Sequence, residues 1–251
     1  LEETAQALYK NWFVDFEFPN ENGQPYKSSG GKMVYNEEFD KEIPYGFSVG
    51  SIEEFAEIID GDRGVNYPSK IHFHSEEYCL FLNAGNITKI GFELSSVSFI
   101  TKERDEILRK GKLKRNDLIL TTRGTVGNVG YYSNEIEYSN VRINSGMVIL
   151  RCLSNNIAIF FYSLMRSGYL KNTIDIYSSG SAQPQLPIKD IKKMPVLIPN
   201  ENIVNEFGRI ANKFQSNIDI QNKQNRKLEK LRGLVLSKMS KVESIKTEEV
   251  L

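Results

Sequence analysis

Apolar residues recur at helical spacing near the start of the chain. Leu1, Ala5, Leu8 and Trp12 lie three or four positions apart, which predicts a helix over residues 1–13. The following segment, residues 14–45, is rich in Gly, Pro, Asn and Ser, the residues that favour turns and loops. We therefore expect a short N-terminal helix followed by a long linker.

Short apolar runs alternate with turn residues from about residue 46 to residue 155. Strands are predicted in "ITKIGFEL", "SVSFIT", "DLILTTRGTVGNVGYY" and "SGMVILRCL", with "NAGN" and "RGTVGN" as connections. Residues 156–171 have the apolar spacing of a helix instead. The central region is therefore predicted to be a mainly β domain, and the fold class is α+β.

The last part of the chain has the pattern of one long helix. Segment 201–240 is predicted to be a coiled-coil-type helix, which spans about 57 Å over residues 202–239 at ~1.5 Å per residue. Its seam has two apolar ends and a middle of amides that either fix the register of a partner helix or face water. The apolar positions are Ile203, Phe207, Ile210 and Phe214, then Leu228, Leu231 and Val235, with Asn217, Gln221 and Gln224 between them. Residues 241–251 are predicted to be a flexible tail.

The two terminal helical patterns resemble each other. When Leu1 is placed on Leu228, "LEETAQALYKNW" aligns with "LEKLRGLVLSKM" and Trp12 meets Met239. The chain thus begins with the tail of one copy of a helix and ends with another copy. We expect the short helix to pack beside the long one.

Charge is distributed unevenly along the chain even though its formal net charge is zero. Residues 1–60 hold 4 basic and 13 acidic residues, whereas residues 61–251 hold 28 basic and 19 acidic ones. Eight of the basic residues lie between Lys102 and Arg123. A basic body of this kind fits a nucleic-acid partner, and a solvated hairpin face explains the cluster equally well.

The cysteines and apolar runs exclude several classes of protein. Cys79 and Cys152 are far apart and lack C-x-x-C spacing, so neither a disulfide framework nor a zinc ribbon is supported, and a cytoplasmic protein is expected. His72 and His74 lie close to Cys79, but these ligands are too few for a metal site, so no metal is expected. The sequence has no signal-peptide pattern and no apolar run of the roughly 18 residues that a membrane span needs.

The sequence lacks three motifs that would indicate catalysis or ATP binding. It has no Asn/Asp-Pro-Pro-Tyr/Phe tetrapeptide of the kind that holds a flipped adenine, no Glu-x-Lys and no G-x-x-x-x-G-K-[ST]. The "GTVGNVG" run has G-x-x-G-x-x-G spacing among predicted strands, which indicates a hairpin rather than a phosphate-binding loop. We therefore expect no catalytic residues in this chain.

Five segments, taken in their order along the chain, carry a resemblance to a known family. They are "LEETAQALYKNWFVDFEFPN", "YKSSGGKMVYNEEFDKEIPYGF", "GDRGVNYPSK", "LKRNDLILTTRGTVGNVGYY" and "SGSAQPQLPIKDIKKMPVLIP", the last running into the long helix. Together they resemble the specificity subunits of type I restriction-modification enzymes. Such subunits carry two target recognition domains and two conserved helical regions. The resemblance implies half a specificity subunit, with one target recognition domain at 46–200 and one full spacer helix.

The resemblance also implies a role and a set of partners. The recognition domain would read one half of a bipartite double-stranded DNA site, and the helices would dock methyltransferase and restriction subunits. The chain itself would hold no cofactor, since S-adenosylmethionine, ATP and Mg²⁺ belong to the partner subunits. Two copies associating through the long helix, or a second half-subunit, would complete the split site, and a place within a longer polypeptide stays open.

Candidate DNA contacts follow from residue chemistry, because Arg, Asn and Gln read base edges and Lys and Arg contact phosphates. The candidates for base readout are Arg63, Asn66, Thr121, Thr122, Arg123, Arg142 and Asn144. The candidates for the DNA backbone are Lys102, Lys110, Lys112, Lys114, Arg115, Ser181 and Gln183. Some have a plain structural alternative, since Arg63 can pair with Asp60 or Asp62 and Asn144 can form a turn.

A second hypothesis comes from another class of protein. The chain could be an assembly protein from a truncated or silent specificity locus, whose helices recruit a partner while its domain reads no DNA. Sequence-selective, salt-sensitive DNA binding distinguishes the two hypotheses.

Overall fold

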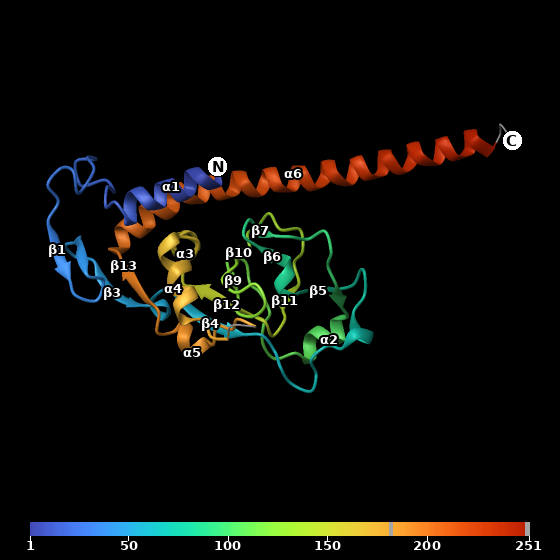
Figure 1. Cartoon of the computed structure of the whole chain (residues 1–251), viewed down its shortest axis with the longest axis horizontal. Helices are drawn as coiled ribbons and strands as arrows, with labels where there is room; N and C mark the ends of the chain where they lie inside the picture. The colour runs from blue at the N-terminus through green and yellow to red at the C-terminus, as the bar shows by residue number, and fades with distance from the viewer. Residues whose placement is uncertain (181–182, 249–251) are drawn as a thin grey trace.

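The computed structural model describes residues 1–180 and 183–248. A domain of strands and short helices lies along the first part of one long C-terminal helix (Figure 1). This helix, α6 (Glu201–Glu248), has 48 residues and spans about 72 Å at ~1.5 Å per residue. Residues 241–248, predicted as part of a flexible tail, continue the helix instead. The predicted α+β class with a single long C-terminal helix is confirmed.

A four-stranded antiparallel sheet forms the centre of the domain. Its order is β10 (Val129–Tyr131), β9 (Leu118–Thr121), β12 (Met147–Cys152) and β4 (Ala56–Asp60). Leu118 and Leu120 of β9 belong to one apolar cluster and Ile119 to another, because successive side chains of a strand point to opposite faces. Both faces of the sheet are therefore buried.

Different elements cover the two faces of this sheet. One face packs against α3 (Asn155–Met165), whose N-cap Ser154 accepts a hydrogen bond from the Ile157 amide. The other face packs against a second sheet of β11 (Val141–Ile143), β5 (Cys79–Leu82) and β8 (Phe99–Ile100), in which β11 and β5 run parallel. Short elements complete this part of the domain: η2 (Lys70–His72), η3 (Ala84–Asn86), α2 (Lys102–Ile107), and the two-residue strands β6 (Ile87–Thr88) and β7 (Gly91–Phe92), which contact β10.

The two ends of the 46–200 region lie together. β3 (Ser48–Ser51) pairs antiparallel with β13 (Pro195–Ile198), and η1 (Ile52–Glu54) follows β3 directly. The predicted helix over 156–171 is divided into α3 and α4 (Gly168–Tyr177), because Ser167 caps a new helix by accepting a hydrogen bond from the Leu170 amide. A one-turn helix, α5 (Ile188–Ile191), leads into β13.

Residues 14–45, expected to be a linker, are packed onto the domain. β1 (Met33–Asn36) and β2 (Lys41–Pro44) form a hairpin, and Phe16, Phe18 and Ile43 are buried. The composition of this segment correctly predicts turns and loops. It does not predict this packing, in which the buried aromatic side chains Phe16 and Phe18 attach the segment to the apolar core.

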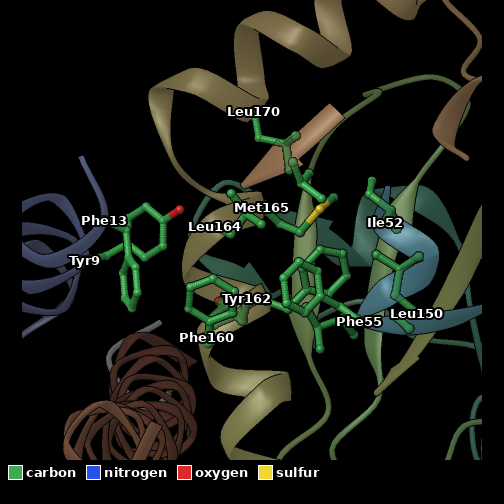
Figure 2. Close-up of a cluster of buried hydrophobic side chains, with 14 of the residues drawn as sticks. Tyr9, Phe13, Ile52, Phe55, Leu150, Phe160, Tyr162, Leu164, Met165 and Leu170 are labelled. Atoms are coloured by element: carbon green, nitrogen blue, oxygen red, sulfur yellow. The ribbon is translucent and has the colours of Figure 1, made fainter. Parts of the chain in front are cut away.

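The N-terminal helix α1 (Glu2–Phe13) packs beside the long helix α6, as predicted, and it also contacts α3, which was not predicted. Figure 2 shows Tyr9 and Phe13 of α1 pointing toward Phe160 of α3. The ring of Phe13 lies 4.8 Å from that of Phe160 and 5.1 Å from that of Phe207 in α6, both edge-on. The aromatic residues of three helices thus share one core.

The seam of α6 differs from the predicted one. Phe207 is completely buried in this chain's own core, together with Val204, Ala211 and Ile218 at helical spacing, and is not free for a partner helix. The predicted seam residues Ile203 and Ile210 pack at the margin of that core, and Phe214 is half-buried. The amides Asn217, Gln221 and Gln224 are exposed in the single chain, which agrees with both alternatives, a contact with a partner helix and a face toward water.

The distal part of α6 extends beyond the domain (Figure 1). Its apolar side chains are exposed, from 55% at Val235 to 62% at Leu228, with Leu231 at 57%. The distal seam predicted from the sequence stays a prediction, whereas the proximal half of the same apolar spacing packs into the domain itself. Among the described residues, no helix is both long and apolar enough to cross a membrane.

Candidate nucleic-acid interface

Several predicted DNA contacts come together at the end of the central sheet where β4 and β9 stop. Figure 1 shows β4, α5 and α2 on the side of the domain away from α6. An open cleft of about 320 Å³ lies at this end, lined by Arg63, Thr122, Arg123, Gln185 and Lys189 among others. These residues come from three separate stretches of sequence, and the fold makes them neighbours.

The turn after β9 is fixed to the segment before α5. The Leu186 amide donates to the Thr122 carbonyl over 2.9 Å, and Arg123 and Gln185 face each other in an isolated bridge. Ser179 and Gln185 exchange two backbone hydrogen bonds of 2.9 Å. Arg123 and Gln185 are exposed, so both carry polar side chains into the cleft from a rigid backbone.

Gly180 makes the loop between Ser179 and Gln185 possible. Its φ of +89° is a left-handed conformation, and a Cβ there would meet the Gln183 carbonyl oxygen at 2.9 Å. Gln183 is exposed at the tip of this loop, whereas the candidate Ser181 lies outside the described residues. Gly180 and the two hydrogen bonds between Ser179 and Gln185 therefore set the conformation at the ends of this polar loop.

The carboxylate of Asp62 fixes the backbone of two basic residues, Arg109 and Lys110, beside the cleft. It accepts hydrogen bonds from the Gly64 amide at 2.9 Å and the Arg109 amide at 2.6 Å, and Lys110 contributes a third backbone amide. Burial alone would raise the pKa of Asp62, but these hydrogen bonds and the Arg109 charge outweigh it and lower the pKa. The side chains of Arg109, 77% exposed, and Lys110 face solvent.

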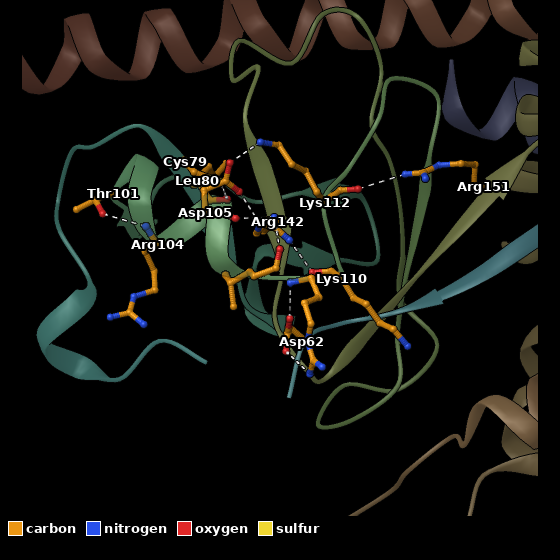
Figure 3. Close-up of polar contacts among 12 residues, drawn as sticks. Asp62, Cys79, Leu80, Thr101, Arg104, Asp105, Lys110, Lys112, Arg142 and Arg151 are labelled. Atoms are coloured by element: carbon orange, nitrogen blue, oxygen red, sulfur yellow. Dashed lines mark hydrogen bonds and ion pairs between the residues drawn. The ribbon is translucent and has the colours of Figure 1, made fainter. Parts of the chain in front are cut away.

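Arg142 is not available for base readout. Figure 3 shows its guanidinium beside Asp105, with which it forms a buried ion pair that Lys112 joins. Each guanidinium nitrogen donates: Nε to the Asp105 carboxylate, Nη1 to the Lys110 carbonyl at 2.6 Å, and Nη2 to the Leu108 carbonyl at 2.9 Å. The prediction for Arg142 is wrong because β11 points this side chain into the domain, where it organises the segment before Gly111.

The predicted basic cluster is divided by the fold. Arg115 donates to the carbonyls of Ser133, Ile136 and Tyr138 and stacks on the Tyr132 ring, so its function is structural. Three other residues predicted to contact the DNA backbone, Lys102, Lys112 and Lys114, have exposed side chains. Lys112 pairs with Asp105, Lys102 lies near Glu106 on α2, and Lys114 is exposed before the start of β9, at the end away from Arg123.

Three further candidates for base readout have structural roles: Thr121 and Thr122 are buried, and Asn144 stabilises a turn. Thr121 is fully buried and Thr122 is 4% exposed, with its hydroxyl donating to the Gly146 carbonyl over 3.0 Å. Asn144 accepts a hydrogen bond from the Gly146 amide at 2.9 Å, which is the turn-forming alternative that the sequence allows. Their hydroxyl and amide groups stabilise the loops that carry Arg123, Gln185 and Arg63.

Arg63 and Asn66 lie in one exposed loop after β4. Arg63 donates to Asp60 at 3.1 Å and to the Ser145 carbonyl at 3.2 Å, and its side chain remains 46% exposed. Asn66 is exposed, and its carbonyl accepts a hydrogen bond from Arg104. Both of these predicted candidates are therefore exposed to solvent, and Arg63 lines the cleft itself.

A sequence model of one protein family matches most of the chain. The family is described as the type I restriction modification DNA specificity domain, and the match covers residues 44–230. This chain belongs to that family. The resemblance noted in its segments is therefore confirmed, and the match includes the whole β-rich domain and the part of α6 that packs against it.

Individual relatives agree with this assignment to the specificity family. The chain is 28% identical over 242 residues to the type I restriction enzyme MjaIX specificity subunit of Methanocaldococcus jannaschii, covering 95% of this chain and 52% of that protein. Its fold is similar to that of an HsdS subunit from Thermoanaerobacter tengcongensis, with a TM-score of 0.51, 13% identity and coverage of 89% of this chain and 45% of that one.

A second solved structure has the same fold. It belongs to a study of complex assembly and conformational transition in a type I R-M system, with a TM-score of 0.51 and 12% identity. That match covers 91% of this chain and 49% of the other. The specificity-family chain described here thus spans about half the length of the relatives that it matches.

Sequence reasoning did not select Gln185, Lys189 and Arg109 of this specificity-family chain as DNA contacts. Gln185 and Lys189 become neighbours of Arg123 only through the hydrogen bonds that join two distant loops. Arg109 was counted in the basic cluster, but its position beside Gly64 depends on the Asp62 carboxylate. A sequence signal existed for Gln185, which follows Gly180 and Pro184 in a loop dense in amides.

Proposed function

We propose that this chain reads one half of a bipartite double-stranded DNA site through the cleft at the end of the central sheet. The convergence of Arg63, Arg123, Gln185 and Lys189 at that cleft carries the proposal. Guanidinium and amide groups match the donor and acceptor patterns of guanine and adenine edges. Buried apolar side chains and hydrogen-bonded loops hold these groups in place, so base readout needs little reordering of the protein.

Exposed cations around the cleft suit the phosphate backbone. Arg109 and Lys110 lie beside the Arg63 loop, and Lys189 lies in the cleft itself. Such cations supply affinity that is independent of sequence and falls steeply as the salt concentration rises. We assign phosphate contact to these three residues and base contact to Arg63, Arg123 and Gln185.

The distal part of α6 is assigned to partner binding. Leu228, Leu231 and Val235 follow a 3-4 spacing and are more than half exposed, which is the pattern of a helix seam without its partner. A second copy of this chain, packed antiparallel along the distal seam, supplies the second recognition domain that a bipartite site requires. Methyltransferase and restriction subunits dock on the same helical region. Since the chain lacks catalytic motifs, methyl transfer and cleavage, with their S-adenosylmethionine, ATP and Mg²⁺, belong to those subunits.

Binding to DNA at several salt concentrations tests the proposal. The full chain, alone and with its methyltransferase subunit, is titrated with mixed-sequence duplexes and with duplexes selected from a random pool. Tight binding to selected duplexes that weakens as salt is added supports DNA recognition. Binding of the methyltransferase without preference among duplexes would instead support the scaffold hypothesis.

A further inference from the structure

Val65 is an apolar residue held entirely in solvent at the tip of the loop after β4. Its exposure is 101% of the reference value, the highest among the exposed large apolar residues of the described chain. Single exposed apolar residues are common on protein surfaces and need no explanation by themselves. What distinguishes Val65 is that the backbone on both sides of it is fixed.

The N-terminal side of the loop is fixed at Gly61 and Asp62. Gly61 packs against the segment that precedes β12. A Cβ on Gly61 would meet the Asn144 carbonyl oxygen at 2.2 Å, so only glycine allows these two backbone segments to lie in contact. The next residue, Asp62, is 6% exposed and accepts the Gly64 amide. The backbone is therefore fixed where it leaves β4, three residues before Val65.

The C-terminal side of the loop is fixed at Asn66 and Tyr67. The Tyr67 amide donates to the Gly64 carbonyl over 3.0 Å, which closes a turn around Val65. Arg104 of α2 donates to the Asn66 carbonyl at 3.3 Å, and the Tyr67 ring packs edge-on against Phe81 at 5.8 Å. These contacts fix the position of the turn, so the exposed Val65 side chain has a defined place on the surface.

The residues that flank Val65 indicate what it is presented to. Arg63 and Asn66 are exposed in the same turn, and Arg109 lies against Gly64, where a Cβ would come within 2.9 Å of its guanidinium. In the DNA major groove, Arg pairs with guanine, Asn pairs with adenine, and apolar side chains contact the C5-methyl group of thymine. The turn thus carries all three kinds of chemistry within four residues.

We propose that Val65 contacts the C5-methyl group of a thymine in the major groove, with Arg63 and Asn66 facing the adjacent bases. This inference rests on the proposed function and adds to it the groove and one base. Residues 63–66 reach at most about 10 Å, which is about three base-pair steps of ~3.4 Å. The thymine methyl is displayed only in the major groove, so the proposal excludes insertion of Val65 into the minor groove.

Replacing thymine by deoxyuridine tests the proposal, because this change removes only the methyl group. The full chain with its methyltransferase subunit is first used to select its preferred duplex from a random pool, and each thymine of that duplex is then replaced in turn. We expect one position at which deoxyuridine weakens binding roughly fourfold, the effect of losing one buried methyl group. In Val65→Ala, which removes two of the three side-chain carbons, the difference in binding between thymine and deoxyuridine at that position should shrink.

A matched control separates this effect from the loss of any exposed apolar side chain. Leu153 is 88% exposed and follows β12 at the end of the sheet away from the cleft, so Leu153→Ala should keep the full deoxyuridine effect. Selective binding without a deoxyuridine-sensitive position, or with a sensitivity that is undiminished in Val65→Ala, overturns the Val65 proposal and leaves the proposed function standing. Absence of selective binding by the unmodified chain overturns both.

Discussion

Arg142 and Asp105 form an ion pair whose side chains are only 6% and 2% exposed. Burial alone would raise the pKa of Asp105, but hydrogen bonds from Lys112 and Arg142, together with their charges, outweigh it and lower the pKa. The same guanidinium binds the carbonyls of Leu108 and Lys110. The pair therefore fixes the segment that presents Arg109 and Lys110 to solvent.

Removal of the Arg142 guanidinium should destabilise the domain strongly. Arg142→Met leaves the Asp105 carboxylate buried without its main partner, and breaking a buried pair in this way costs about 3–5 kcal/mol. Arg142→Lys should recover only part of the loss, because an ammonium group cannot reach carboxylate and carbonyls together. Urea unfolding measures the free energy of unfolding of each variant. A loss below about 1 kcal/mol, accompanied by altered base preference, would restore Arg142 as a DNA-reading residue.

The overall architecture follows from the sequence because it depends on apolar spacing. The spacing in Leu228, Leu231 and Val235 predicts the long helix, and "LILTTRGTVGNVGYY" predicts the β9–β10 hairpin, whose Gly124 and Gly127 take φ values of +76° and +90°. The orientation of single polar side chains does not follow from spacing. Arg142 and Arg123 look alike in the sequence, and only the pairing of β11 with β5 turns the first inward.

The acid stability of the domain should depend on Asp62. Its pKa is lower in the folded chain than the ordinary value of about 3.9, so the unfolded chain binds more protons at low pH. The stabilisation is therefore fully present above about pH 4 and is lost as the pH falls through the folded pKa. Asp62→Asn should cost about 1–3 kcal/mol at pH 7, and this difference should shrink toward pH 3.

Urea unfolding at both pH values measures this dependence. Glu106→Gln, at a side chain that is 64% exposed on α2, serves as the control and should change stability by less than about 0.5 kcal/mol. A difference between the unmodified chain and Asp62→Asn that grows on acidification would show that the Asp62 carboxylate is not stabilised in the folded chain.

The salt dependence of DNA binding should locate the phosphate contacts. Replacing Arg109 and Lys110 by Ala should weaken binding to all sequences and reduce the slope of log affinity against log salt by about 1 per lost contact. Lys114→Ala is the matched control, since Lys114 precedes β9 at the end away from the cleft. Titrations at four salt concentrations measure the slopes. An effect of Lys114 that equals that of Arg109 and Lys110 would place DNA on another face.

Two positions of α6 should separate folding from association. Phe207 is completely buried among Tyr9, Trp12 and Phe13, so Phe207→Ala should cost about 3–5 kcal/mol of stability. Leu231 is 57% exposed, so Leu231→Asp should leave the stability of the single chain within about 0.5 kcal/mol while abolishing association. Sedimentation velocity measures association; an unmodified chain that stays monomeric with its methyltransferase subunit present would exclude the homodimer.

Mapping of DNA methylation tests most directly whether the cleft reads DNA. Cells carry this chain with its methyltransferase subunit, and the methylated sequence is compared among the unmodified chain, a double variant with Arg123→Ala and Gln185→Ala, and the control Lys114→Ala. We expect an interrupted site for the unmodified chain and the control, and either lost methylation or relaxed bases within the half-sites for the double variant. An unchanged methylated sequence, at an unchanged level, in the double variant would contradict DNA recognition by the cleft.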